Sequence, residues 1–279
     1  LARLVLVTPE GTGRDLRNGR GARVQVLING DNANTATTVM GYAVAIVGGL
    51  SVDLQIARLG TAVAPLAVEP RVWFNPELHS TLFLVPGLIG FIAMITAVVL
   101  TALSVVREKE RATMEQIRMA PIGTGQYVVG KVLPYVVLSF VSATAVLLAA
   151  MAFFGMPMGG SWGLLLTVTF VFVAGALALG LLISTLVDSQ QAAFQVALLV
   201  SFLPTFTLSG FVFPIASMPG FVRAVTYVVP ARYYLAALRG IVLKGVGFAY
   251  VWPQIAALLI FTAAAMALAA LRLRREAAG

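Results

Sequence analysis

The sequence predicts an α-helical polytopic membrane protein with five transmembrane helices, preceded by part of a small α/β domain. Three observations support this fold class. Of the 279 residues, 59% are hydrophobic and only 11% are charged, with a mean hydropathy of +0.94, whereas soluble proteins carry about 25% charged residues. Five long uncharged runs follow residue 80, and the charged residues gather before these runs and in the connections between them.

The five runs lack Asp, Glu, Lys, Arg and His, and each is longer than 20 residues. They are residues 82–105, 132–154, 163–187, 192–213 and 251–271. A helix of about 20 apolar residues crosses the roughly 30 Å hydrocarbon core of a membrane. Because unpaired backbone groups are costly in lipid, each run is expected to be a helix. Together with their connections, these runs form a transmembrane domain over residues 81–279.

Residues 1–80 are more polar and predict a partial extracytoplasmic α/β domain. Residues 23–29 alternate apolar and polar side chains, which is typical of a strand. A helix is expected over residues 33–59 and a second strand over 68–74. Residues 32–52 are uncharged and long enough to cross a membrane, so a sixth span stays open as an alternative to a soluble helix.

Lys and Arg in the short connections indicate the orientation. One side holds eight of them: Arg107, Lys109, Arg111, Arg118, Lys131, Arg272, Arg274 and Arg275. The other side holds four: Arg223, Arg232, Arg239 and Lys244. Because cytoplasmic loops carry the excess, we expect the C-terminus in the cytoplasm and the N-terminal domain outside, in the cytoplasmic (inner) membrane. The net charge of +8 is explained by these flanking residues, so no nucleic-acid partner is expected.

Residues 106–122, VREKERATMEQIRMAPI, are the most charged stretch and follow an apolar run directly. Seven charges fall within twelve residues there. Pro121 cannot continue a helix, so we expect a cytoplasmic helix over residues 106–121 that stops near Ala120. Such a helix between two spans is placed where a soluble partner can push on it. The alternative is a solvated loop that only sets topology.

The connection over residues 210–250 is apolar but interrupted. Its helix-breaking residues are Gly210, Pro214, Pro219, Gly220 and Pro230. Segments of this kind often dip into the membrane and return, which predicts a re-entrant external hairpin. An ordinary outer-surface loop is the alternative. Pro204 lies in the middle of the fourth apolar run, where a kink is plausible.

Several kinds of site are excluded or disfavoured by the residues. There is no cysteine, and the single histidine, His79, is too few for a histidine cluster. Residues 125–131 match the spacing GxxxxGK, but neither the required Ser/Thr nor a preceding strand is there. We therefore predict no catalytic, metal-binding or cofactor-binding residues. Asp188 is the only acid between Gln116 and Arg275, which argues against an ion-driven carrier and an intramembrane enzyme.

Two pairs of glycines in or beside the apolar runs predict close helix packing. They are Gly155 with Gly159 and Gly175 with Gly180. Small residues let helix backbones approach closely in a membrane.

The chain resembles the permease subunit of type-2 ABC exporters, in the branch often linked to multidrug or antibiotic efflux. The stretches that carry the resemblance are VQVLINGDNANTA, PRVWFNPELHS, VPGLIGFIAM, SVVREKERATMEQIRMAPI, GKVLPY, SGFVFPIASMP and PARYYLAALRGIVLKG, in the family's order from Arg23 to Gly245. The family has six spans, and we expect its first span and the true N-terminus to precede Leu1. Arg118, Met119 and Ala120 replace the more usual apolar stretch before the proline.

The resemblance implies a permease that couples export to a separate cytoplasmic ATP-binding subunit, which would bind the ATP and magnesium. It also implies a second permease copy or paralogue, contact with membrane lipid, and, where the cell has two membranes, a periplasmic adaptor and an outer-membrane channel. A membrane scaffold without a transported substrate is the alternative. The substrate cannot be read, since apolar spans suit lipids, drugs and polyketides alike.

The resemblance also assigns residues to two roles. Those expected to couple to the ATPase are Arg107, Glu108, Lys109, Glu110, Arg111, Met114, Glu115 and Gln116, with a shorter second contact at Asp188 and Gln190. Those expected in the gating or re-entrant segment are Pro204, Gly210, Pro214 and Pro219.

The orientation is testable with topology reporters. A reporter fused after Gly279 or inserted near Gly123 is expected to be cytoplasmic, and one inserted near Gly159 external, because of the eight-to-four distribution of Lys and Arg. Reporter activity in intact cells measures this directly. A cytoplasmic signal at Gly159 would contradict the orientation.

Overall fold

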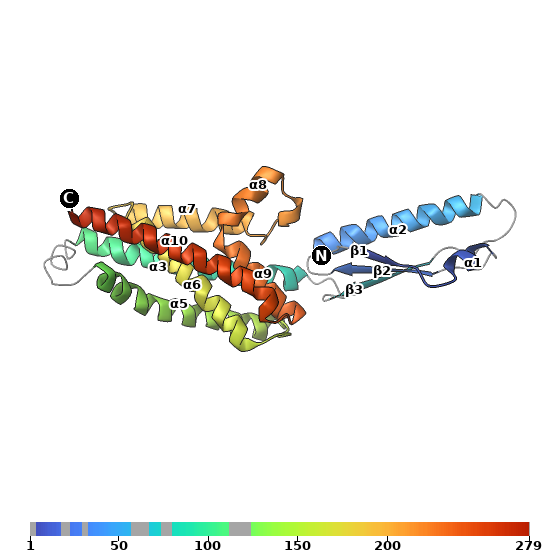
Figure 1. Ribbon diagram of the computed structural model, residues 1–279, viewed down its shortest axis with the longest axis horizontal. Helices are drawn as coiled ribbons and strands as arrows, with labels where there is room; N and C mark the ends of the chain where they lie inside the picture. Colours follow the sequence, from blue (N-terminus) through green and yellow to red (C-terminus); the bar gives the residue numbers. More distant parts are fainter. Residues whose placement is uncertain are drawn as a thin grey trace. The chain divides into compact units, whose positions relative to one another are not determined.

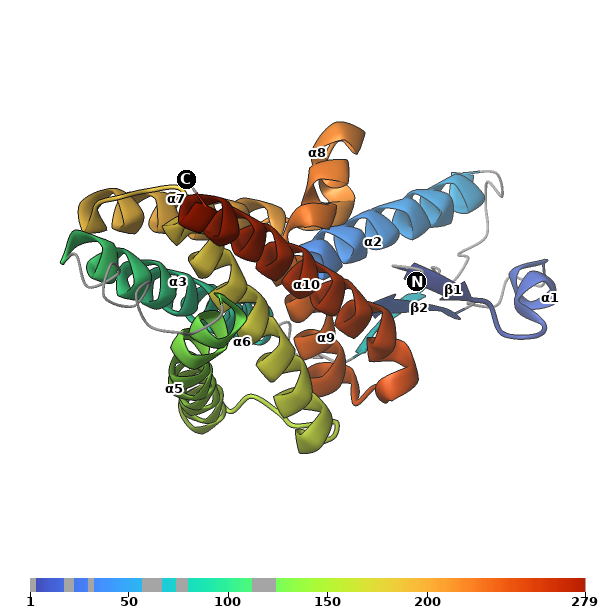
Figure 2. The ribbon, with the colours of Figure 1, turned by 60° about the vertical axis from the view of Figure 1, so that its left-hand side comes forward.

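The computed structural model describes residues 4–17, 23–29, 33–56, 67–73, 80–111 and 124–278. The chain divides into two units, Leu1–Phe83 and Leu84–Gly279, and each is described by itself. Figures 1 and 2 show a helix lying along a small sheet in the first unit and a bundle of long helices in the second.

The first unit is a three-stranded sheet with one long helix. Its elements in order are β1 (Leu4–Val7), α1 (Thr12–Arg17), β2 (Arg23–Asn29), α2 (Ala33–Ile56) and β3 (Ala67–Trp73). β2 is the central strand; it pairs antiparallel with β1 and parallel with β3. Since α2 connects the two parallel strands, β2, α2 and β3 form a β-α-β unit.

The packing of α2 follows from the alternation in β2. Val26 and Ile28 point to the same face of the sheet, and Ala36 and Ala43 of α2 are buried against them. α2 thus packs on the sheet, as the α/β domain expected from the sequence requires, and whether residues 32–52 cross a membrane stays a prediction. The side of the membrane on which this unit lies stays a prediction.

The second unit is helical. Its long helices are α3 (Ser80–Glu110), α5 (Thr124–Phe154), α6 (Trp162–Ser184), α7 (Gln190–Leu208), α9 (Pro230–Lys244) and α10 (Phe248–Ala278). Within the described part of the chain, all of these except α9 are long and apolar enough to cross a membrane. The five runs predicted from the sequence fall on these five helices, which supports a polytopic membrane protein.

The end of α7 differs from the prediction. The apolar run continues to Phe213, but the helix ends at Leu208. The Ser209 hydroxyl donates a hydrogen bond to the Thr205 carbonyl, and Gly210 adopts a left-handed conformation with φ of +82°. Such a conformation stops a helix and suits glycine. Pro204 lies inside α7, which continues past it.

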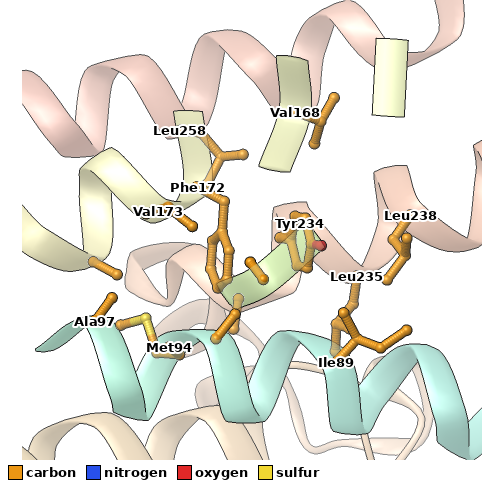
Figure 3. Packing of buried hydrophobic residues seen from close by; sticks show 14 of the residues in the cluster. Ile89, Met94, Ala97, Val168, Phe172, Val173, Tyr234, Leu235, Leu238 and Leu258 are labelled. Carbon is orange, nitrogen blue, oxygen red and sulfur yellow. The ribbon is translucent and has the colours of Figure 1, made fainter. Parts of the chain in front are cut away.

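The interior of the second unit is organised around α6, which packs against α5, α9 and α10. Phe172 of α6 stacks face to face on Tyr234 of α9, with 4.1 Å between ring centroids and 4° between planes. The Tyr234 and Thr169 hydroxyls are hydrogen-bonded at 3.2 Å, so the buried polar atoms satisfy each other. Figure 3 shows Phe172 and Tyr234 on the side of α3 that carries Met94 and Ala97.

Glycines of α6 allow its neighbours to approach closely, as predicted for two of them. A Cβ at Gly180 would lie 2.5 Å from the Val98 carbonyl oxygen of α3, and one at Gly175 would lie 2.9 Å from the Thr262 hydroxyl of α10. The other predicted pair lies in the non-helical connection between α5 and α6: nothing lies within 4 Å of a Cβ at Gly155, whereas Gly159 does approach a neighbouring helix, α9.

That connection instead packs on the end of α9. The Gly159 N–H donates to the Val242 carbonyl at 2.9 Å. A Cβ at Gly245, which ends α9 with φ of +64°, would lie 2.7 Å from the Gly159 carbonyl oxygen. Backbone packs directly on backbone here, so the α5–α6 and α9–α10 connections share one end of the unit.

The predicted breakers between α7 and α10 each begin or end an element. Pro214 precedes η1 (Ile215–Ser217), and Pro219 precedes α8 (Gly220–Val225). Then η2 (Thr226–Val228) follows, and Pro230 is the first residue of α9. The chain therefore turns back into the helical unit after α7, where α9 packs on α6 and α10. The depth of this connection in a membrane stays a prediction.

The close approach at Gly180 is testable by adding one methyl group. Gly180→Ala should destabilise the protein by about 1–3 kcal/mol, because α3 must move away from the new Cβ. Gly130→Ala is the matched control: this exposed α5 glycine has nothing within 4 Å of its Cβ position. The control should gain about 0.5–1 kcal/mol from helix propensity. Thermal unfolding in detergent measures both, and a Gly180 variant as stable as the control would contradict the packing.

Candidate functional site

Two segments about eighty residues apart in the sequence meet at one end of the helical unit. The last turn of α3 lies against the turn between α6 and α7. We call this contact the charged junction, and its members are Arg107, Lys109, Glu110, Asp188, Ser189 and Gln190. These residues come from both of the stretches that the resemblance assigned to coupling, which were expected to be separate contacts.

Glu110 completes the N-terminal cap of α7 from a different helix. Its carboxylate accepts a hydrogen bond from the Gln190 backbone N–H at 2.6 Å and another from the Gln190 side-chain amide. Ser189 is the N-cap residue, and its hydroxyl accepts from the Ala192 N–H at 3.2 Å. The first N–H groups of a helix have no partner within the helix, and its positive end favours an anion. The Glu110 carboxylate provides both the hydrogen-bond acceptor for the Gln190 N–H and the negative charge.

Two weaker polar contacts accompany this cap. The Arg107 Nε donates to the Gln190 side-chain oxygen at 3.4 Å, and the Lys109 ammonium lies 3.8 Å from the Asp188 carboxylate. The Asp188 side chain is 97% exposed. Ion pairs this exposed typically contribute little to stability. The charged junction therefore presents one well-exposed carboxylate, that of Asp188, beside the capped start of α7.

Local sequence explains why the two segments end where they do. Arg107 and Lys109 lie in the last turn of α3, where the negative end of a helix favours cations. At the end of α6, the Thr185 hydroxyl donates to the Leu182 carbonyl at 2.7 Å. This bond tightens the end of α6, and only five residues, 185–189, connect α6 to α7.

The hydrogen bonds from Gln190 also shift the titration of Glu110. This residue lies beyond the uncharged run 82–105, and the side-chain and backbone bonds from Gln190 lower the pKa of its carboxyl. A lowered pKa means that the folded state favours the carboxylate. The cap is therefore present at neutral pH and is lost only as the pH falls through the lowered value.

The structure corrects the first part of the cytoplasmic helix that was predicted over residues 106–121. Residues 106–110 are the end of α3 and not the start of a separate helix. Val105 and Val106 are both fully buried, so the packed face of α3 continues into the charged turn without a break. Glu108 lies in this turn and Arg111 directly follows it. The other predicted coupling residues, Met114, Glu115 and Gln116, lie outside the described residues.

The sequence did not single out Ser189. The signal was available, because a serine directly before an apolar helix is a common N-cap. The predicted gating residues do not belong to the charged junction: Pro204 lies far along α7, and Gly210, Pro214 and Pro219 follow its end. Among the described residues, no three or more His, Asp or Glu side chains are grouped to hold a metal ion.

The cap is testable by amide hydrogen exchange. Glu110→Ala should speed exchange at the N-terminus of α7, around residues 190–192, because the Gln190 N–H loses its acceptor. The rest of the helical unit should exchange unchanged. Glu108→Ala removes the same kind of side chain from the same turn and serves as the control. Equal exchange at residues 190–192 in both variants would contradict the assigned cap.

Comparison with known proteins gives the family. The model described as "ABC-2 family transporter protein" matches residues 2–271. The probable multidrug ABC transporter permease YbhS of Escherichia coli (strain K12) is 39% identical over 228 residues, which are 80% of this chain and 59% of that protein. YbhR of the same strain, another probable multidrug ABC transporter permease, is 31% identical over 99% of this chain and 74% of its own length.

The inner membrane transport permease YhhJ of that strain is 30% identical over 96% of this chain and 71% of its own length. The chain thus spans about three-fifths of YbhS and nearly three-quarters of YbhR and YhhJ. The match to the family model covers almost the whole chain and confirms the resemblance found in the sequence. The chain belongs to the ABC-2 transporter family.

Proposed function

We propose that this chain is the permease subunit of an ATP-driven exporter, and that a separate ATP-binding subunit acts on it at the charged junction. The observation that carries the proposal is the contact between residues 107–110 and 188–190. Two segments expected to couple to an ATPase lie side by side and are hydrogen-bonded, next to the exposed side chain of Asp188. The relatives YbhS, YbhR and YhhJ are permeases, which supports the permease role.

The energy for transport is proposed to come from outside the chain. The five apolar runs expected to cross the membrane contain no Asp or Glu, and Asp188 lies in the turn between α6 and α7. Proton- or ion-driven carriers place titratable groups inside the membrane. ATP and magnesium would be bound by the partner, and this chain would supply no cofactor ligand.

A route for the motion runs along α3 and α7. At one end, Glu110 holds the N-terminus of α7. About 28 Å further along α3, Phe91 contacts Phe202 and Phe206 of α7, with centroid distances of 5.3 and 6.1 Å. Because the two helices contact each other at both places, a displacement at the charged junction would move them together.

The motion would reach the segment after α7 through Phe211. Its ring packs on α3 so closely that a Cβ at Gly87 would lie 1.9 Å from a ring carbon. Arg239 of α9 donates to the Gly210 carbonyl at 2.9 Å. The proposed gate, Gly210 with Pro204, Pro214 and Pro219, is therefore linked to α3 and to α9.

Further parts of the proposal rest on the family and the relatives' names. YbhS and YbhR are described as probable multidrug transporters, so amphipathic drugs or antibiotics are the proposed substrates. The permease would work with a second copy or a paralogue in the inner membrane, with its C-terminus in the cytoplasm and its N-terminal unit outside. A periplasmic adaptor and an outer-membrane channel would complete the path in a cell with two membranes.

The proposal is testable by reversing charge at the charged junction. Glu108→Lys combined with Glu110→Lys should largely abolish coupling, because both the partner contact and the α7 cap lose their carboxylates. In vesicles with the wild-type partner, basal ATP hydrolysis should persist, whereas substrate-stimulated hydrolysis and export are lost. One reversal should have a weaker effect, since exposed pairs contribute only about 0.2–1 kcal/mol each.

A matched control changes two charges elsewhere on the helical unit. Arg272→Gln combined with Arg275→Gln alters the end of α10 and should keep most of the stimulation. Copurification with the partner shows whether assembly is intact in each variant. Full stimulation and normal export in the Glu108/Glu110 variant would leave the stretch as a topology signal. If the wild-type protein exported no substrate, the scaffold alternative would be favoured.

A further inference from the structure

The connection between α7 and α9 carries exposed apolar side chains that the helical unit does not cover. Phe221 is 82% exposed and Val228 is 71% exposed, and Val225 and Tyr227 are exposed beside them. We call this region the α8 surface, and its members are Phe221, Arg223, Val225, Tyr227, Val228 and Arg232. Figures 1 and 2 both show α8 standing out from the helix bundle.

The same region is strongly basic. Residues 210–250 contain four Lys or Arg and no Asp or Glu. The Arg232 guanidinium lies 3.9 Å above the centre of the Tyr227 ring and donates to the Thr226 hydroxyl. The Tyr233 hydroxyl donates to the Tyr227 carbonyl at 2.8 Å, which holds the backbone of this turn in place. A cation is thus positioned next to the exposed apolar side chains, and Arg223 is exposed on α8 itself.

The position of the α8 surface along the helical unit matches a membrane boundary. α7 starts at the charged junction and has 19 residues, so it is about 28 Å long. This is close to the roughly 30 Å thickness of the hydrocarbon core. With the charged junction at one membrane surface, the segment after α7 comes to the opposite one. Aromatic and basic side chains are favoured at such boundaries.

We propose that the α8 surface is a membrane-interface anchor whose occupant is phospholipid. Phe221, Tyr227 and Val228 enter the outer part of the acyl layer, while Arg223 and Arg232 bind lipid phosphates above it. Phospholipid offers an anion directly over apolar chains, which matches this alternation of cations and apolar groups. A second copy fits poorly, because its own α8 surface is equally basic and would face the first with like charge.

This inference goes beyond the proposed coupling and does not depend on it. It also differs from the predicted hairpin, because the α8 surface rests at the boundary and does not dip to the membrane centre. α9, which is buried against α6 and α10, is the part that enters the bundle.

Spin labels test the proposal at single positions, because the 279 residues contain no cysteine. Phe221→Cys and Val228→Cys would each be labelled in the full chain, reconstituted in vesicles of phosphatidylcholine and phosphatidylglycerol. Two reference labels calibrate depth: Ile260→Cys on the exposed side of α10, within its apolar run, and Gln191→Cys on α7, directly after the charged junction. Power saturation then measures collision with oxygen, which is enriched in lipid, and with a water-soluble nickel chelate.

The labels on the α8 surface should give oxygen-to-nickel ratios between those of Ile260 and Gln191. A ratio equal to that of Gln191 would overturn the proposal in favour of an aqueous loop. A ratio as high as that of Ile260 would overturn it in favour of a deep re-entrant hairpin. Low collision with both reagents would overturn it in favour of a covering protein.

The role of the arginines has its own test. Arg223→Gln combined with Arg232→Gln should shift the Val228 label toward the Gln191 value, because the phosphate contacts are lost. Arg275→Gln, at the far end of α10, should leave that label unchanged. A Val228 ratio that does not shift in the double variant, with the Ile260 ratio preserved as evidence of normal insertion, would overturn the assigned phosphate binding.

Discussion

The helical unit depends on close packing around α6. In the most apolar stretch of α6, 61% of the residues are buried, whereas the share is 22% in each of α5, α7 and α10. In lipid, helices gain little from the hydrophobic effect between them, and association relies on direct contact. Gly175 and Gly180 permit that contact with α10 and α3, and the stacked Phe172 and Tyr234 bring α9 into the same interior. α5, α7 and α10 leave most of their apolar stretches exposed, as lipid-facing helices do.

The same constraint explains where the charges are. A charge inside the hydrocarbon is costly, so the five uncharged runs carry no charged side chain, and the charges of the second unit lie beside these runs or between α7 and α10. At one end they form the charged junction, where Glu110 of α3 caps α7. A carboxylate that serves a helix other than its own ties the two helices together. This makes the charged junction a suitable place for a partner to act, while the membrane-crossing runs stay free of charge.

The two proposals concern opposite ends of α7. At the start of α7, the partner would act on the charged junction, where the end of α3 is hydrogen-bonded to the start of α7. Beyond its end, Phe211 against α3 and Arg239 against Gly210 join it to the connection that carries the α8 surface. A segment held at the membrane boundary would give α7 a fixed point against which movement at the charged junction could act. The length of α7, close to the membrane thickness, makes both placements compatible.

Hydropathy and alternation by themselves predicted the five apolar helices and the strand at residues 23–29, and the resemblance of several sequence stretches indicated the family. These features depend on neighbours in sequence, so local patterns carry them. Only the tertiary structure decided that Glu110 meets Gln190, that α3 continues to residue 110, and that Gly159 packs on α9. Each of these depends on contact between residues far apart in the chain. No local sequence pattern shows that Val105 and Val106 are buried. Nor does one show that the Glu110 carboxylate accepts a hydrogen bond from Gln190.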